Sequence, residues 1–217
     1  MRHTINEDAV IEAADAGIFV VADGMGGHTD GALASRSIVE IIHRVAYIND
    51  NLDDKVADIE AALHSVNEAL RQEACSREGN VIIGSTVAAL IMDAHYAVCV
   101  WSGDSRIYLR RSDHLYQLTR DHTLAADDAD APSGILTRAV GSADVLALDR
   151  VVTEIQEGDT FLVCSDGITK SLSDPDLDLL LADPIDGLAA RVVAQALAQG
   201  SSDDISAILV RCIGADQ

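Results

Sequence analysis

Apolar residues along the chain follow two periods, one typical of strands and one typical of helices. Near the start, two short apolar runs flank a polar turn at residues 15–17, which predicts a β-hairpin. Apolar residues then recur every three or four positions over 31–48, and again after Asp53 and Asp54, which are typical helix-start residues. The sequence therefore predicts a hairpin followed by two amphipathic helices.

The middle of the chain changes to short apolar runs separated by turn residues. The separators are too short to contain helices, so the runs are expected to form an antiparallel meander rather than strand–helix–strand units. The predicted elements after the first two helices are strands 86–92, 95–101, 106–110, 115–118, 151–155 and 160–164, helices 176–182 and 187–199, and strand 205–212. The expected fold class is layered α+β.

Length and composition indicate one globular domain, expected over residues 1–217, without an internal repeat or linker. Hydrophobic residues make up 48% and aromatic residues 3%, so the core must consist mainly of Ala, Val, Leu and Ile. No apolar run approaches the ~20 residues that span a bilayer, and no signal-peptide pattern begins the chain, so a cytoplasmic protein is expected. The four cysteines lack C-x-x-C spacing and are predicted to be buried free thiols.

The charge is strongly negative, with 36 acidic and 15 basic residues and a formal net charge of −21. Such a chain is not expected to bind a nucleic acid backbone or an anionic membrane. If the substrate is itself an anion, bound cations must reverse the local field. Otherwise the acidity serves as a solubilising surface.

Acidic residues recur where apolar strands end. Asp23 follows one apolar run and precedes a glycine-rich stretch, in which backbone atoms can approach a ligand closely. Alone, Asp23 could equally begin a hydrogen-bonded turn. The pattern repeats at Asp8, Asp104, Asp166 and the pair Asp203–Asp204.

Carboxylates gathered at one end of a sheet would repel one another unless cations bound among them. No Cys or His accompanies these acids at metal-ligand spacing, so an oxygen-only site suits Mg²⁺ or Mn²⁺ better than zinc. Two such ions can activate a bridging water and stabilise an in-line attack on phosphorus. No Cys or Ser nucleophile with an adjacent base is recognisable in the sequence.

Eight motifs occur in the order and approximate spacing of a known family, and by them the chain resembles the PPM family of metal-dependent serine/threonine protein phosphatases (protein phosphatase 2C-like enzymes) of bacterial type. The resemblance covers nearly the whole chain and implies a four-layer α-β-β-α sandwich with two central antiparallel sheets and the site at one end. The motifs are Asn6-Glu7-Asp8, Ala22-Asp23-Gly24-Met25-Gly26-Gly27-His28, Gly84-Ser85-Thr86, Gly103-Asp104-Ser105-Arg106, Leu118-Thr119-Arg120-Asp121-His122, Thr137-Arg138-Ala139-Val140-Gly141, Cys164-Ser165-Asp166-Gly167 and Asp203-Asp204-Ile205-Ser206.

The resemblance implies a role for each matching acid. Asp23 resembles the carboxylate that bridges two metals, and the Gly24 carbonyl resembles a ligand of the second metal. Asp166 and Asp203 resemble ligands of the first metal. The implied mechanism is direct attack on phosphoserine or phosphothreonine by a hydroxide that bridges two Mn²⁺ or Mg²⁺ ions, without a phosphoenzyme.

Three further acids and one lysine bear on the metals. Glu7 and the catalytic candidate Asp8 are implied to lie beside the metals and hold metal-bound waters, while Asp104 resembles the ligand of a third, weaker metal. Four residues after Asp166, bacterial relatives commonly have another Asp for this third metal, whereas this chain has Lys170. A cation there is expected to weaken the third metal or to replace part of its charge, and a similar lysine occurs in phosphatases associated with type VI secretion.

Other positions depart from the family pattern. Arg2 lies one residue further out than the usual phosphate-binding Arg, whose place His3 takes, but its length and bidentate guanidinium keep it the expected catalytic, substrate-binding residue. Met25 replaces a His proposed as general acid in eukaryotic relatives, so His28 or a metal-bound water is the candidate proton donor. At the Asp203–Asp204 pair, where Asn is usual second, alignment favours the first acid as the ligand.

The flap at 123–135 is shorter than usual, which implies an open, weakly selective cleft. The predicted function is a phosphoprotein phosphatase, expected to be a monomer, acting on phosphorylated proteins that include targets of a partner Ser/Thr kinase. The displaced Arg2 and the short flap leave open a regulatory or binding module with little turnover. An open cleft also permits a hydrolase of small phosphoesters.

Overall fold

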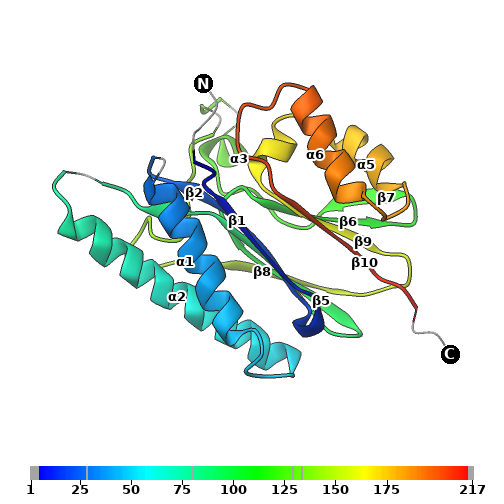
Figure 1. The fold of residues 1–217 in the computed structure, drawn as a ribbon, viewed down its shortest axis with the longest axis horizontal. Helices are drawn as coiled ribbons and strands as arrows, with labels where there is room; N and C mark the ends of the chain where they lie inside the picture. Colours follow the sequence, from blue (N-terminus) through cyan, green and yellow to red (C-terminus); the bar gives the residue numbers. More distant parts are fainter. Residues whose placement is uncertain (1–4, 28, 80, 129, 133, 215–217) are drawn as a thin grey trace.

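The computed structural model describes residues 5–27, 29–79, 81–128, 130–132 and 134–214. Two antiparallel sheets lie face to face between two layers of helices (Figure 1). The first sheet has the order β1 (Asp8–Ala13), β2 (Ile18–Met25), β4 (Val87–Met92), β5 (Tyr96–Ser102) and β8 (Asp149–Glu154), with β3 (Gly84–Ser85) paired to β2. The second has the order β10 (Ala207–Arg211), β9 (Thr160–Cys164), β6 (Arg106–Arg111) and β7 (His114–Gln117).

Two long helices cover the first sheet and three shorter ones cover the second (Figure 1). The side chain of Asn51 accepts hydrogen bonds from two backbone amides of the first turn of the second long helix and so fixes its start. The helices on the first sheet are α1 (Thr29–Val45) and α2 (Leu52–Ser76), those on the second are α4 (Asp166–Thr169), α5 (Asp174–Leu181) and α6 (Leu188–Ala198), and the short α3 (Leu124–Asp127) lies in the flap.

Three apolar layers hold these elements together. Within β2, successive side chains point to opposite faces, so Val20 packs with Ile38 under the helices whereas Val21 packs with Phe161 between the two sheets. The third layer joins Leu162 of β9 to helices α4, α5 and α6. The predicted α+β class and the four-layer sandwich with two antiparallel sheets are therefore confirmed.

The predicted meander is wrong at one point. Strands β4 and β5 pair with each other, as do β6 and β7, but the chain crosses from the first sheet to the second between Ser102 and Arg106. Gly103 makes this crossing with a φ of 117°, and a Cβ there would lie 2.6 Å from the Thr86 side chain. Strands buried on both faces have the same apolar pattern whether the next strand pairs beside them or lies in another sheet.

The cysteine prediction is only partly right. All four thiols are free, and Cys99 and Cys164 are buried, but Cys212 is half-buried and Cys75 is exposed. The exposed thiol lies in the last turn of α2, whose end extends beyond the first sheet (Figure 1).

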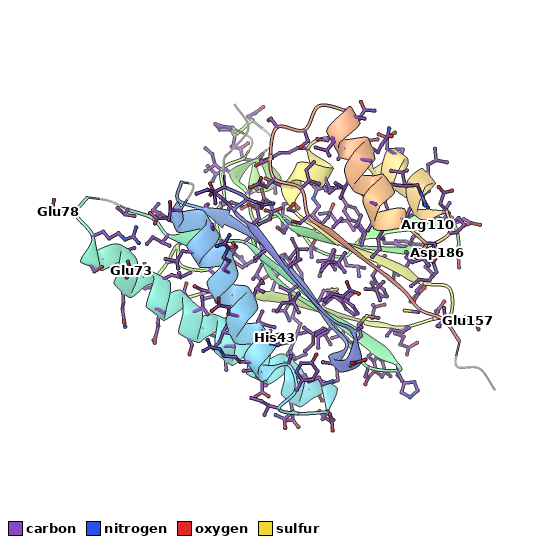
Figure 2. The ribbon with its side chains drawn as sticks, in the orientation of Figure 1. His43, Glu73, Glu78, Arg110, Glu157 and Asp186 are labelled. Atoms are coloured by element: carbon purple, nitrogen blue, oxygen red, sulfur yellow. The ribbon has the colours of Figure 1, made fainter. Side chains whose placement is uncertain are left out.

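Acidic side chains are spread over the outside of the molecule. Glu73 and Glu78 lie at the far end of α2, and Glu157 and Asp186 lie on the opposite side (Figure 2). None of the helices in the described part of the chain combines the length and the apolar character that a membrane-crossing segment needs.

Candidate active site

The hairpin of β1 and β2 brings the first group of predicted site residues together. Asp8 and Asp23 are direct partners in the antiparallel register of the two strands. The backbone N–H of Gly24 donates a hydrogen bond of 3.1 Å to the carbonyl of Glu7. The hairpin therefore places Glu7, Asp8, Asp23 and Gly24 side by side at its open end.

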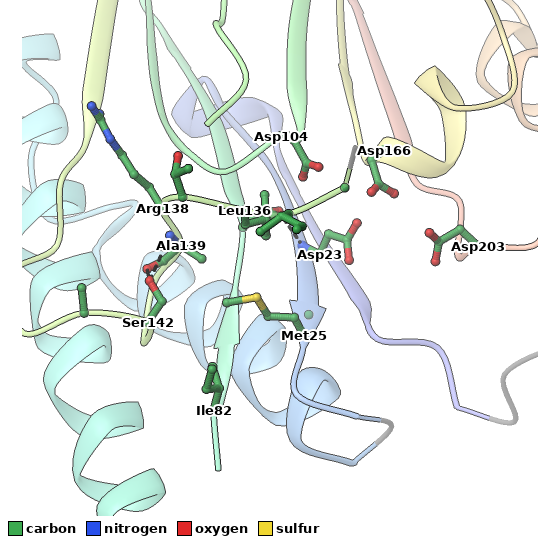
Figure 3. A pocket seen from close by; sticks show the side chains of 16 residues that line it. Asp23, Met25, Ile82, Asp104, Leu136, Arg138, Ala139, Ser142, Asp166 and Asp203 are labelled. Carbon is green, nitrogen blue, oxygen red and sulfur yellow. Dashed lines mark hydrogen bonds between the residues drawn. The ribbon is translucent and has the colours of Figure 1, made fainter. Parts of the chain in front are cut away.

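The backbone of Asp23 is fixed from a third segment. Its N–H donates to Thr86 Oγ1 at 3.1 Å, and its carbonyl accepts hydrogen bonds from the Thr86 N–H at 2.8 Å and from Ser85 Oγ at 2.9 Å. Thr86 Oγ1 is also 2.7 Å from Ser105 Oγ, in the crossing between the sheets. These contacts leave the Asp23 carboxylate to line the cavity (Figure 3).

The remaining predicted acids reach the same place from the second sheet and the sheet crossing. Asp166 begins α4 directly after β9, and Asp203 precedes β10, which pairs with β9. Asp104 follows β5 at the crossing. Together with Asp23 they line a cavity of about 660 Å³ (Figure 3).

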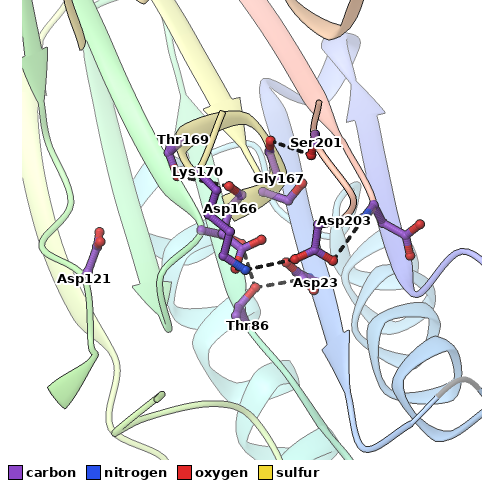
Figure 4. A network of polar contacts seen from close by, with 12 residues as sticks. Asp23, Thr86, Asp121, Asp166, Gly167, Thr169, Lys170, Ser201 and Asp203 are labelled. Atoms are coloured by element: carbon purple, nitrogen blue, oxygen red, sulfur yellow. Dashed lines mark hydrogen bonds and ion pairs between the residues drawn. The ribbon is translucent and has the colours of Figure 1, made fainter. Parts of the chain in front are cut away.

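A lysine ammonium lies between two of these acids. Lys170 Nζ is 2.5 Å from Asp166 Oδ2 and 2.9 Å from Asp203 Oδ2 (Figure 4). In this arrangement no three His, Cys, Asp or Glu side chains of the described residues converge as metal ligands. Lys170 thus neutralises two acids that would otherwise face each other in the cavity.

Hydrogen bonds join the hairpin to the segments around β9 and β10. Ser165 Oγ donates to Asp8 Oδ2 at 2.9 Å while accepting from the Ser206 N–H at 2.9 Å. The Glu7 N–H donates to Asp204 Oδ2 at 2.7 Å. The carboxylate of Asp204 is therefore engaged with the hairpin backbone.

Burial and mutual repulsion raise the pKa values of the acids at this site, because both effects disfavour the charged carboxylate. Burial raises the pKa of Asp8 to about 6 although Ser206 and Ser165 donate to it. Burial, with repulsion from Asp166 and then Asp121, raises the pKa of Asp104 to about 6.

The same two effects act on the central acids. Burial, followed by repulsion from Asp8 and other acids, raises the pKa of Asp23 well above its usual value. Burial also raises the pKa of Asp166, against the opposing contact with Lys170.

The donor set fits a pair of hard divalent cations. Asp8 Oδ1 and Asp166 Oδ1 are buried and accept no hydrogen bond from the described residues. Buried carboxylate oxygens without a donor, among acids that repel one another, are stabilised by a bound cation. Because every candidate ligand atom is oxygen, Mg²⁺ or Mn²⁺ suits the site.

Some predicted residues cannot be placed, and one contributing residue was not predicted. Arg2 and His28 lie outside the described residues.

Asn67 of α2 is buried and was not predicted. Its Oδ1 accepts a hydrogen bond from the Gly141 N–H at 2.7 Å, and its Nδ2 donates to the Ala143 carbonyl at 3.1 Å. These two bonds fix one wall of the cavity. A polar residue on the buried face of an amphipathic helix was the available signal.

A cavity at one end of a β-sandwich, with acids from both sheets and only oxygen ligands for divalent cations, defines the class of metal-dependent phosphoester hydrolases. The family model described as Protein phosphatase 2C matches residues 2–209. The chain belongs to the protein phosphatase 2C family, as its motifs predicted.

Individual relatives resemble the chain over nearly its full length. "Serine/threonine phosphatase stp" of Listeria innocua is 30% identical over 227 residues, which cover 96% of this chain and 90% of the relative. The structure of "PppA, a key regulatory component of T6SS in Pseudomonas aeruginosa" has a TM-score of 0.92 at 37% identity, with 96% of this chain and 91% of that chain covered.

A second solved structure includes metal ions. The catalytic domain of the serine/threonine protein phosphatase PstP, in complex with two manganese ions, has a TM-score of 0.86 at 27% identity and covers 99% of this chain and 94% of that chain. The chain spans 43% of the full PstP of Mycobacterium tuberculosis, to which it is 28% identical. The similarity thus extends to a metal-bound catalytic domain.

Proposed function

We propose that this protein hydrolyses phosphoserine and phosphothreonine in phosphoproteins with the help of two Mn²⁺ or Mg²⁺ ions. The observation that carries the proposal is that Asp23, Asp166 and Asp203 line one cavity at the end of the two sheets, with Asp8 paired to Asp23. Similarity to named phosphatases supports the reaction, and similarity to the manganese-bound PstP domain supports the cofactor.

The acids have distinct roles in this proposal. Asp23 would hold both ions, the Gly24 carbonyl would hold the second, and Asp166 and Asp203 would hold the first. When bound, the ions supply a water-derived nucleophile and neutralise charge that builds up on the phosphoryl group.

The remaining predicted residues complete the proposed machinery. Asp8, oriented by Ser165, and Glu7, between the hairpin and α1, would orient water beside the ions. Asp104 is the proposed ligand of a third, weaker ion, which Lys170 disfavours. Arg2 binds the phosphate of the substrate, and His28 is the proposed donor of the leaving-group proton.

The likeness to PppA suggests a biological setting. We propose that the chain is a single phosphatase domain over residues 1–217 with a shortened flap at 123–135, and that it acts in the cytoplasm as a monomer. Its substrates are phosphoproteins made by a partner Ser/Thr kinase in a type VI secretion pathway. Lys170, which the sequence linked to that subfamily, and the match to PppA support this setting.

The test is hydrolysis of a phosphothreonine peptide with Mn²⁺ by the wild type, Asp23→Ala and Asp166→Ala. Turnover is expected in the wild type and loss of turnover in both variants. Equal, negligible phosphate release by all three proteins would overturn the enzyme proposal and favour a binding module. Release from an aryl phosphate but never from phosphopeptides would favour a small-ester hydrolase.

A further inference from the structure

The cavity that contains the acids has two chemically different sides. Asp104, Asp166 and Asp203 lie on one side, Met25 and Ile82 lie on the other, and Asp23 lies between them (Figure 3). We use the term apolar wall for the second side. The apolar wall consists of Met25, Ile82, Ile135, Leu136 and Ala139.

The apolar wall presents large hydrophobic side chains to solvent. Ile82 is 57% exposed and Ile135 is 45% exposed, and they come from different segments, one just before β3 and the other from the flap. Apolar side chains that meet beside a reaction centre are typical of a site that buries part of a ligand. The surrounding acids alone give no reason for these residues.

The apolar wall is built on fixed backbone. Gly84 pairs with Met25, and a Cβ on Gly84 would lie 2.7 Å from Met25 Cε, so the glycine leaves room for this side chain. Ala139 precedes Val140, which exchanges backbone hydrogen bonds of 3.0 and 2.9 Å with Ser85. The part of the wall formed by Met25 and Ala139 is therefore in place before a ligand arrives, which lowers the ordering cost of binding.

The charges around the cavity disfavour an acidic partner for this wall. Arg138 is the one cation among the described residues that line the cavity, and its Nη1 already donates to Asp149 Oδ1 at 2.8 Å. An acidic side chain placed here would lack a free cation and would face the acids on the other side. The wall suits an uncharged, apolar group.

We propose that the apolar wall binds an aliphatic side chain that flanks the phosphorylated residue of a protein substrate. The inference rests on the proposed phosphoprotein phosphatase function, because the cavity is continuous from the acids to the wall and one peptide can occupy both sides. It replaces the expected weakly selective cleft with a preference for an apolar neighbour of the phosphorylated residue.

The experiment compares peptides that differ in one flanking residue. One phosphothreonine peptide has only Ser and Gly around the phosphothreonine, and each of the others has Leu at one flanking position. The proteins are the wild type, Ile82→Ser, Ile135→Ser and the control Ile48→Ser, which alters an equally exposed isoleucine between α1 and α2. Hydrolysis with Mn²⁺ gives kcat/KM, and fluorescence anisotropy with non-hydrolysable phosphonate versions gives binding.

Leu at the preferred position should raise kcat/KM about tenfold over the Ser–Gly peptide, chiefly through KM, and should tighten binding by a similar factor. This ratio should fall to about twofold in Ile82→Ser and Ile135→Ser and stay at the wild-type value in Ile48→Ser. Thermal unfolding confirms that each variant is folded, and exposed positions are chosen for that reason.

The possible outcomes distinguish failure of this inference from failure of the proposed phosphatase function. Hydrolysis without any preference for Leu, or a preference that both wall variants retain, overturns the apolar wall as a subsite and leaves the phosphatase function intact. Leu-dependent binding without hydrolysis overturns the function and retains the subsite. Neither hydrolysis nor binding of any phosphopeptide overturns both.

Discussion

The acids at the site are held in place in two different ways, one on the β1–β2 hairpin and the other on the second sheet. On the hairpin, Asp8 and Asp23 are direct partners in paired strands, and backbone hydrogen bonds to Thr86 fix the position of Asp23. On the second sheet, Asp166 begins a four-residue helix and Asp203 lies in a turn, and the ammonium of Lys170 bridges their carboxylates.

We call the acids on the hairpin and the acids on the second sheet the two halves of the site. Their different supports predict how each half responds to substitution and to metal binding. Strand register sets the positions of the hairpin acids, so a change there displaces a proposed ligand that the rest of the fold cannot restore. The second half depends on ion pairs of a half-exposed lysine, and pairs of this kind contribute about 1 kcal/mol or less. Substitutions on the hairpin should therefore cost more than substitutions of Lys170.

The largest effect is expected for Asp23→Asn. Without the central carboxylate, kcat/KM on a phosphothreonine peptide should fall by at least about a thousandfold, because under the proposed function two cations would lose their shared ligand. Calorimetric titration should show loss of Mn²⁺ binding, and chelation of the metal from the wild type should lower activity to a similar level. The control is Asp15→Asn, an exposed acid at the opposite end of the same hairpin, which should behave as wild type. Mn²⁺ binding retained by Asp23→Asn would show that the hairpin does not bridge the ions.

The next largest effect is expected for Gly31→Ala in α1. A Cβ at this position would collide with Glu7 Oε2, so the Glu7 carboxylate must shift from its buried position beside the hairpin. We expect Mn²⁺ affinity and kcat/KM to fall about tenfold or more, although alanine favours a helix by up to about 1 kcal/mol over glycine.

A double-variant cycle tests whether Gly31 acts through Glu7. In a Glu7→Ala background, Gly31→Ala should add little, because the group with which it collides has been removed. Full additivity of the two losses would mean that the glycine is needed for another reason, such as its close approach to the Gly24 backbone.

Ser165→Ala should have an intermediate effect because it removes a contact between the two halves. Asp8 loses one of its two serine donors and the Ser206 N–H loses its acceptor, at a cost of roughly 1–3 kcal/mol. The thermal unfolding temperature and kcat/KM should both decrease, and kcat/KM should decrease about tenfold. In the control Ser201→Ala, the hydroxyl donates to the Gly167 carbonyl instead of a carboxylate, and a smaller loss is expected. Equal losses in both variants would argue against a role for Ser165 in orienting Asp8.

The sequence predicted the elements better than their assignment to sheets. Amphipathic periods located α1 and α2, and apolar runs located the strands, because both patterns follow from local geometry. The crossing at Gly103 was not predicted, since strands buried on both faces carry no information about their neighbours. The short helix that begins at Asp166 was also missed, because one helical turn has no recognisable period.

The acids of the site could be located from the motifs, whereas their contacts could not. The acids could be selected because each stands where a strand ends, and the structure places Asp8 opposite Asp23. No local pattern could indicate that Ser165 donates to Asp8, a contact 157 residues apart in sequence. The bridge from Lys170 to Asp203 depends in the same way on the pairing of β9 with β10.

The smallest effect is expected at Lys170, where the comparison between the two halves is tested most sharply. Lys170→Met removes the ammonium that competes for Asp166 and Asp203, so Mn²⁺ should bind about three- to fivefold more tightly, while the metal-free protein loses about 1 kcal/mol of stability or less. Lys170→Asp should in addition raise Mn²⁺ occupancy near Asp104, seen as an extra binding step in calorimetric titration. The control Lys55→Met removes the same charge from the other lysine of the chain, whose Nζ donates to the Ala16 carbonyl at 2.8 Å, and should leave the titration unchanged. If Lys170→Met and Lys170→Asp both titrate like the wild type, the ammonium does not compete with the metal, and the second sheet supports its acids as firmly as the hairpin does.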